Sequence, residues 1–206
     1  MLFSAVTQGA LITVEFTAEV TDVREGTRGF PVDTPFFEGK VDIGDIITGT
    51  YTYDSSIPDS YPELWLGVYE YNTSPYGISL TIGEFTFETD PENVDFTIKV
   101  FNNPPTVDSS DQYLVTSENN LPLPNGVLVR QIFLNLGSDW RPLSSDALPA
   151  TAPALDDWPY AVVGISGTTP EGGFYIEGEV TSIIPEPTTI SLLGLGALAL
   201  LRRRRR

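Results

Sequence analysis

Four aspartates are the first residues in this sequence whose type and spacing could do chemistry. Asp42 and Asp45 precede the stretch Ile46–Tyr53, and Asp54 and Asp59 follow it. Loop carboxylates are hard oxygen ligands that suit Ca²⁺, so one interpretation is a calcium site. However, the spacing matches no EF-hand, and a strand between the two pairs would hold them about 25 Å apart. The alternative is ordinary turn chemistry, because aspartate favours turns and both glycine and proline adjoin these positions.

A second acidic pair, Asp156 and Asp157, stands directly before Trp158. All three lie in a long irregular stretch, Ser138–Pro159, that also contains Trp140. A ring that stacks on a pyranose, beside carboxylates that bind its hydroxyls, would form a sugar-binding edge. These two aspartates and two tryptophans are therefore candidate ligand-binding residues. The alternative is that the tryptophan folds onto the core and the acids stay solvated.

The sequence contains no cysteine and no histidine. Disulfides, thiolate nucleophiles, Ser-His-Asp triads and metal sites built from Cys or His are therefore excluded. Carboxylate chemistry remains, because two acids about 5 to 9.5 Å apart suffice for a glycosidase. With 28 acidic residues, some pair will meet that distance by chance. We therefore expect a protein that is not an enzyme and has no cofactor other than Ca²⁺, with a secreted carboxylate-dependent hydrolase as an alternative.

Charge is segregated along the chain. The formal net charge is −17, but residues 1–201 carry 6 basic and 28 acidic groups, a net charge of −22. The remaining basic residues close the chain: Arg202, Arg203, Arg204, Arg205 and Arg206. An acidic body repels phosphate backbones, so we do not expect nucleic acid as a partner.

The C-terminal residues form three blocks in a fixed order. Pro185-Glu186-Pro187 comes first, the uncharged stretch Thr188–Leu201 follows, and the arginines end the chain. As a helix, that stretch would be about 21 Å long, shorter than a full bilayer span. Snorkelling arginine side chains and local thinning of the bilayer extend its reach. We therefore expect a short hydrophobic membrane helix, with the arginines on the cytoplasmic side and the body on the other.

This tail closely resembles the PEP-CTERM sorting signal of Gram-negative bacteria, over residues 185–206. The resemblance implies that an exosortase, an integral-membrane enzyme of cysteine-transpeptidase type, recognises Pro185, Glu186 and Pro187 and removes the tail. The arginines would retain the precursor in the inner membrane before the protein is released or attached at the cell surface. Such systems accompany exopolysaccharide and biofilm production, which makes exopolysaccharide an implied partner. The stretches 44–59, 79–87 and 174–187 more loosely resemble a recurrent group of PEP-CTERM cargo without established activity.

Cargo of this kind begins with a secretory signal peptide. Residues 1–9 lack a basic region and a full apolar core, although Leu2–Val6 followed by Ala10 fits the end of one. We interpret residues 1–9 as the remnant of a truncated signal peptide whose start codon is assigned too late. The alternative is a chain that is not exported and whose tail is vestigial.

Residues 10–184 are expected to form one all-β domain. Apolar and polar residues alternate with a period of two, which is typical of half-buried strands. Gly83-Glu84 suits a type II′ hairpin turn. The predicted strands are 11–23, 46–53, 78–82, 85–89, 94–100, 112–117, 127–136, 160–166 and 174–181. Short strands with connections rich in proline and glycine favour an antiparallel, jelly-roll-like β-sandwich.

The sequence thus favours an exported, exosortase-sorted surface or matrix protein. A carbohydrate- or Ca²⁺-binding β-sandwich module with the same sorting route is the first alternative, and the hydrolase is the second.

Overall fold

The computed structural model describes residues 11–26, 36–61, 63–104, 110–139 and 142–185. Within them the body is all-β and antiparallel, which confirms the predicted fold class. Two single-turn 3₁₀ helices, η1 (Pro124–Gly126) and η2 (Leu155–Asp157), are the only helical turns in these ranges. The strands are β1 (Leu11–Glu25), β2 (Ile46–Asp54), β3 (Leu66–Tyr71), β4 (Gly77–Ile82), β5 (Phe85–Glu88), β6 (Phe96–Phe101), β7 (Asp111–Ser117), β8 (Leu128–Ser138), β9 (Tyr160–Thr169) and β10 (Gly172–Pro185).

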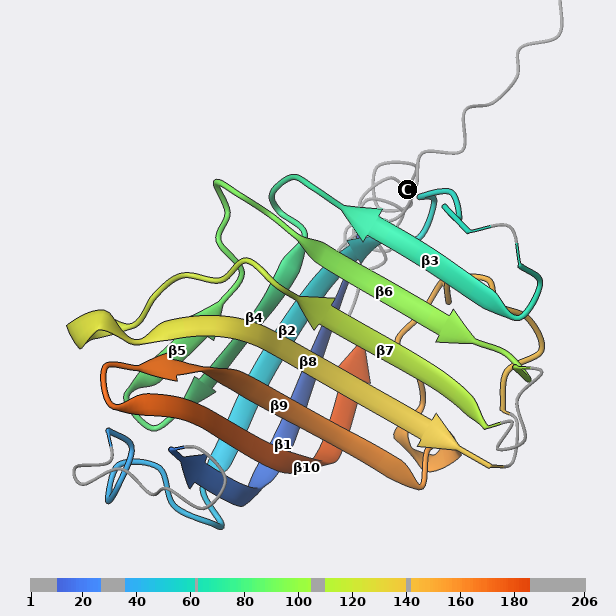
Figure 1. The fold of residues 1–206 in the computed structure, drawn as a ribbon. Coiled ribbons are helices and arrows are strands. Elements are labelled where there is room, and N and C mark those ends of the chain that lie inside the picture. Colours follow the sequence, from blue (N-terminus) through green and yellow to red (C-terminus); the bar gives the residue numbers. More distant parts are fainter. Residues whose placement is uncertain (1–10, 27–35, 62, 105–109, 140–141, 186–206) are drawn as a thin grey trace, which may run out of the picture.

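All these strands belong to one sheet, in the order β3-β6-β7-β8-β9-β10-β1-β2-β4-β5. The sheet curls over as a half-barrel, so that β6, β7, β8 and β9 lie across β1, β2 and β4 (Figure 1). The predicted jelly-roll-like sandwich is not confirmed. A sandwich packs two separate sheets, whereas here β10 and β1 join the two halves by continuous backbone pairing.

The bend in the sheet lies in β1 and β10. The first part of β10 pairs with β9 over 172–179, and its pairing with β1 continues to Pro185. The register between β1 and β10 shifts twice, at Thr17/Ala18 and at Val20/Asp22. Such bulges increase the local twist and bend a strand. The bulges let the two long strands β1 and β10 take part in both layers of the curled sheet.

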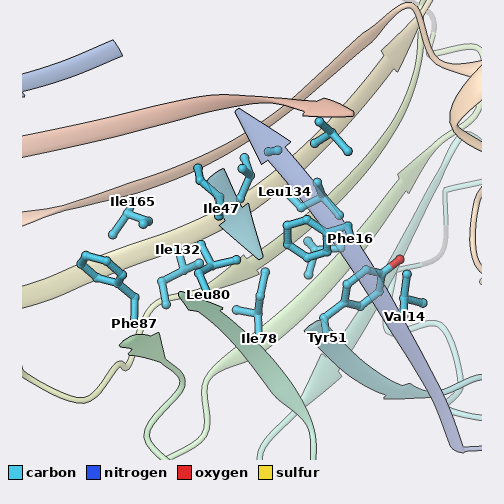
Figure 2. Close-up of a cluster of buried hydrophobic side chains, with 14 of the residues drawn as sticks. Val14, Phe16, Ile47, Tyr51, Ile78, Leu80, Phe87, Ile132, Leu134 and Ile165 are labelled. Atoms are coloured by element: carbon cyan, nitrogen blue, oxygen red, sulfur yellow. The ribbon is translucent and has the colours of Figure 1, made fainter. Parts of the chain in front are cut away.

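The alternation predicted for the first strand is confirmed by the burial of β1. Its inward residues Ile12, Val14, Phe16, Ala18 and Val20 are all at most 8% exposed. They belong to one core cluster with residues of the opposite layer. Figure 2 shows Val14 and Phe16 of β1 in this cluster with side chains of β8 and β9. Full burial of each large aliphatic or aromatic side chain contributes about 1.5–3 kcal/mol, so this shared core holds the two layers together.

The predicted hairpin between β4 and β5 is also present. Gly83 has φ +55°, and among the described residues Asn103 is the only non-glycine residue with positive φ. The turn therefore needs a left-handed residue only at its first central position, which fits type II′ and excludes type I′.

The long irregular stretch before β9 covers one end of the core. Trp158 and Leu148 are 5% and 9% exposed, and both belong to the core cluster. The loop packs so closely on β3 that a Cβ built on Gly67 would lie 2.2 Å from the backbone oxygen of Asp146. Only glycine fits at that position without moving the loop.

A buried carboxylate fixes the start of the same loop. Asp111 is 0% exposed, and its Oδ1 accepts a hydrogen bond of 2.9 Å from the Asn103 N–H. Its Oδ2 accepts a second bond of 2.8 Å from the Leu143 N–H. Asp111 thus ties the β6–β7 connection to the long loop, and each of its oxygens satisfies a backbone donor.

Candidate functional site

The four aspartates around β2 do not form one site. Asp42 and Asp45 lie before β2, whereas Asp54 ends it and Asp59 follows it. Among the described residues, no three Asp or Glu side chains are grouped closely enough to hold a metal ion. The proposed calcium site is thus not assembled in the part of the chain that the structure describes.

Each of these aspartates instead belongs to a turn. Asp45 Oδ2 accepts a hydrogen bond of 2.9 Å from the Asp42 N–H, and Asp54 Oδ1 accepts one of 2.8 Å from the Ser56 N–H. Asp59 Oδ1 accepts bonds from the N–H groups of Tyr61 and Val68, at 2.9 and 2.8 Å. The last bond satisfies a backbone donor on the open edge of β3, which is how proteins protect edge strands.

Of the candidate sugar-binding residues that the structure describes, none is an exposed tryptophan. Trp158 is 5% exposed and packs in the core, so a pyranose cannot stack on it in this structure. Asp156 and Asp157 are exposed in η2. Trp140 lies outside the described residues. The alternative placement, a loop tryptophan folded onto the core, is the one observed for Trp158.

Buried tyrosine hydroxyls bind backbone groups of the long loop. Tyr53 Oη donates to the Pro149 oxygen at 2.9 Å, and Tyr69 Oη donates to the Asp146 oxygen at 3.0 Å. Tyr69 Oη also accepts a 2.9 Å bond from the Leu148 N–H. Desolvation on burial raises the pKa of both tyrosines above the ordinary value. They therefore stay protonated at neutral pH and act as donors, not as bases.

The described part of the chain ends with β10, whose last residues pair with β1 alone because the pairing with β9 ends at Glu179. The last register pairs between β10 and β1 are Glu15 with Ile184 and Val14 with Pro185. The chain is thus held in the sheet up to the first proline of Pro185-Glu186-Pro187. Proline lacks a backbone N–H, so it ends the ladder without leaving a donor unpaired.

An open pocket of about 340 Å³ adjoins this exit point on the outer face of the sheet. Ile184 and Ser182 of β10 line it together with Glu15 of β1 and Thr50 of β2. Ile184 is 53% exposed. The surface beside the exit therefore combines polar side chains with apolar ones, Phe16 and Ile184, and is accessible to another molecule.

Comparison with known families decides what the tail is. Residues 184–206 match the family model of the PEP-CTERM protein-sorting motif. The chain ends in a PEP-CTERM sorting signal. No curated protein and no solved structure matches the chain.

The PEP-CTERM motif implies recognition by an exosortase and sorting to the surface or the extracellular space. The match begins at Ile184, so its first two residues are still paired with β1, while residues 186–206 lie outside the described residues. The predicted hydrophobic helix over 188–201 and the arginine cluster belong to that undescribed part. Among the residues that are described, no helix has the length and hydropathy needed to cross a membrane.

Proposed function

We propose that this chain is the precursor of an exported surface or matrix protein and that its C-terminal tail is the sorting signal. Thr188–Leu201 holds the precursor in the inner membrane, and Arg202–Arg206 keep its end on the cytoplasmic side. An exosortase recognises Pro185-Glu186-Pro187, cuts the tail, and leaves the body at the cell surface or free outside it. The observation that supports this most strongly is the match of residues 184–206 to the PEP-CTERM motif.

We further propose that the body is not an enzyme and acts as a structural component beside exopolysaccharide. Two kinds of described residue support this. Three of the aspartates around β2, Asp45, Asp54 and Asp59, accept hydrogen bonds from backbone N–H groups of their own turns. The buried tyrosines Tyr53 and Tyr69 bind loop backbone and stay protonated.

The position of the motif constrains how the exosortase approaches. Pro185 is still paired with β1, and two further residues reach at most about 7 Å. An enzyme that binds Pro187 must therefore come within that distance of the folded sheet. The surface it meets contains Ile184, Glu15 and Thr50. Recognition thus takes place against the body, without an intervening linker.

The test compares two glutamates in cells that contain the exosortase. Glu186→Ala changes the motif, whereas Glu171→Ala changes an exposed glutamate of the β9–β10 turn. We expect the first variant to remain in the inner-membrane fraction and the second to reach the surface as the wild type does. An exosortase deletion should reproduce the Glu186→Ala result. Normal surface arrival of Glu186→Ala, or of the wild type without exosortase, would contradict the proposal.

A further inference from the structure

An open pocket of about 410 Å³ lies on the outer face of β7, β8 and β9. None of its residues belongs to the sorting tail or to the residues matched by the family model. Its lining includes Gln112 of β7, Asn135 of β8, Asp139 and Tyr160. Tyr160, the first residue of β9, is 52% exposed. An aromatic ring is thus presented to solvent beside two side-chain amides and a carboxylate.

The sheet places these side chains by its register. Gln112 pairs with Gly137, and Gly137 pairs with Tyr160, so the three form one row across the three strands. Gly137 has no side chain, and the tyrosine ring leans over it: a Cβ built there would lie 3.4 Å from Tyr160 Cδ1. The near side of the ring therefore contacts the sheet at Gly137, while about half of the side chain stays exposed to solvent.

The polar groups of the pocket are also fixed in position. Gln112 Nε2 donates a 2.7 Å hydrogen bond to Asn135 Oδ1. This bond holds the two amides side by side and does not use the Gln112 carbonyl oxygen or the Asn135 Nδ2 donors. Asp139 is exposed and adds an acceptor at the same end of the strands. The site therefore offers both donors and acceptors to a ligand rich in hydroxyl groups.

We propose that this pocket binds a pyranose unit of a neutral polysaccharide. A pyranose has an apolar C–H face that packs on an aromatic ring, and hydroxyls that exchange hydrogen bonds with amides and carboxylates. An extended peptide is disfavoured because β7, β8 and β9 are interior strands with no open edge. Nucleic acids and uronic acid polymers are disfavoured because residues 1–201 carry a net charge of −22.

This site replaces the sugar-binding edge expected around Trp158, which is buried. The two aromatic residues are two positions apart, but only Tyr160 faces outward, at 52% exposure against 5%. The proposal does not depend on sorting, because it concerns residues of the folded sheet alone.

Isothermal titration calorimetry on the full chain would test it, in a detergent without a sugar headgroup. The probes are the neutral hexasaccharides cellohexaose, laminarihexaose and mannohexaose, with hexagalacturonate as the anionic comparison. We expect at least one neutral probe to bind, and Tyr160→Ala to weaken that binding at least about tenfold. Tyr160→Phe should keep binding within about twofold, since the stacking face is retained.

The matched control is Tyr61→Ala, which removes a tyrosine of similar exposure, 42%, before β3. It should leave the affinity unchanged. Thermal unfolding of each variant would check that a variant that no longer binds is still folded. The proposal would be overturned by no binding of any neutral probe, by equal or tighter binding of hexagalacturonate, or by unchanged affinity in a folded Tyr160→Ala variant.

Discussion

The body and the tail of this chain carry their functional information in different ways. In the tail, three blocks follow one another in the sequence, and their order alone matches the PEP-CTERM motif. In the body, residues become neighbours only through pairing of distant strands. Thr17 and Thr181 exchange a 3.1 Å hydrogen bond although 164 positions separate them. A sorting signal can therefore be recognised from the linear sequence, whereas a binding surface forms only when the chain folds.

This difference predicts that the two regions respond separately to mutation. Changes in the tail should alter processing without altering the stability of the sheet. Changes in the body should alter stability or binding and leave processing intact as long as the chain folds.

Deleting Arg202–Arg206 should have an all-or-none effect on retention of the precursor. The hydrophobic stretch is short for a bilayer, and without the arginines it loses its cytoplasmic anchor. We expect loss of exosortase processing, read by immunoblotting of membrane and surface fractions. The midpoint of thermal unfolding should stay at the wild-type value. A variant that is processed normally would show that the arginines have no retention role.

Trp158→Ala should cost about 3–5 kcal/mol of the free energy of unfolding, because the indole is buried in the core. Tyr160→Ala, two positions along, should cost under about 1 kcal/mol, because its ring is half exposed. Urea denaturation of the two variants measures both values. Similar costs for the two would contradict the opposite placement of these rings.

Asp111→Ala should cost about 2–3 kcal/mol. The substitution leaves the part-buried N–H groups of Asn103 and Leu143 without their acceptor. Asp139→Ala, in an exposed position after β8, is the control and should stay within about 0.5 kcal/mol of wild type. Equal effects of the two substitutions in urea denaturation would remove the assigned role of Asp111.

Gly67→Ala should cost about 1–3 kcal/mol, because the added Cβ lies 2.2 Å from the Asp146 backbone oxygen. Gly173→Ala is a matched control in a strand, since its Cβ would meet backbone oxygens only at 3.7 Å or more. Limited proteolysis should detect release of the long loop in the first variant alone. Wild-type resistance of Gly67→Ala would mean that the loop does not depend on this close approach.

Tyr69→Phe should have the smallest effect, about 1 kcal/mol. It removes the hydroxyl that donates to the Asp146 oxygen and accepts from the Leu148 N–H, but keeps the ring. Thermal unfolding measures the change, and Tyr61→Phe, at an exposed site, is its control. No difference between the two variants would show that the Tyr69 hydroxyl does not help to hold the loop.

Periodicity predicted most of the strands because each has one face in the core. It missed β3, whose inward residues are Gly67, Tyr69 and Tyr71 and whose outward residues include Leu66 and Val68. This arrangement nearly reverses the usual contrast between an apolar inner face and a polar outer face. Tyr69 and Tyr71 pack inward, and their hydroxyls bind backbone oxygens. In the sequence, however, tyrosine is amphipathic and does not identify the buried face of a strand.

The curled single sheet could not be predicted from periodicity. A period of two tells which face of a strand is buried but not which strand is its partner. The pairing of β1 with β10, and the bulges that bend them, join residues from opposite ends of the chain. The pocket at Tyr160 was missed for the same reason. Its row of Gln112, Gly137 and Tyr160 exists only once β7, β8 and β9 are in register.

The intact mass of the protein recovered from the cell surface tests the central claim most directly. If the tail is a sorting signal that the exosortase removes, the mature protein from cells with exosortase lacks Thr188–Arg206. The protein from cells without exosortase keeps the whole tail. A surface protein whose mass still includes Arg202–Arg206 would contradict the account.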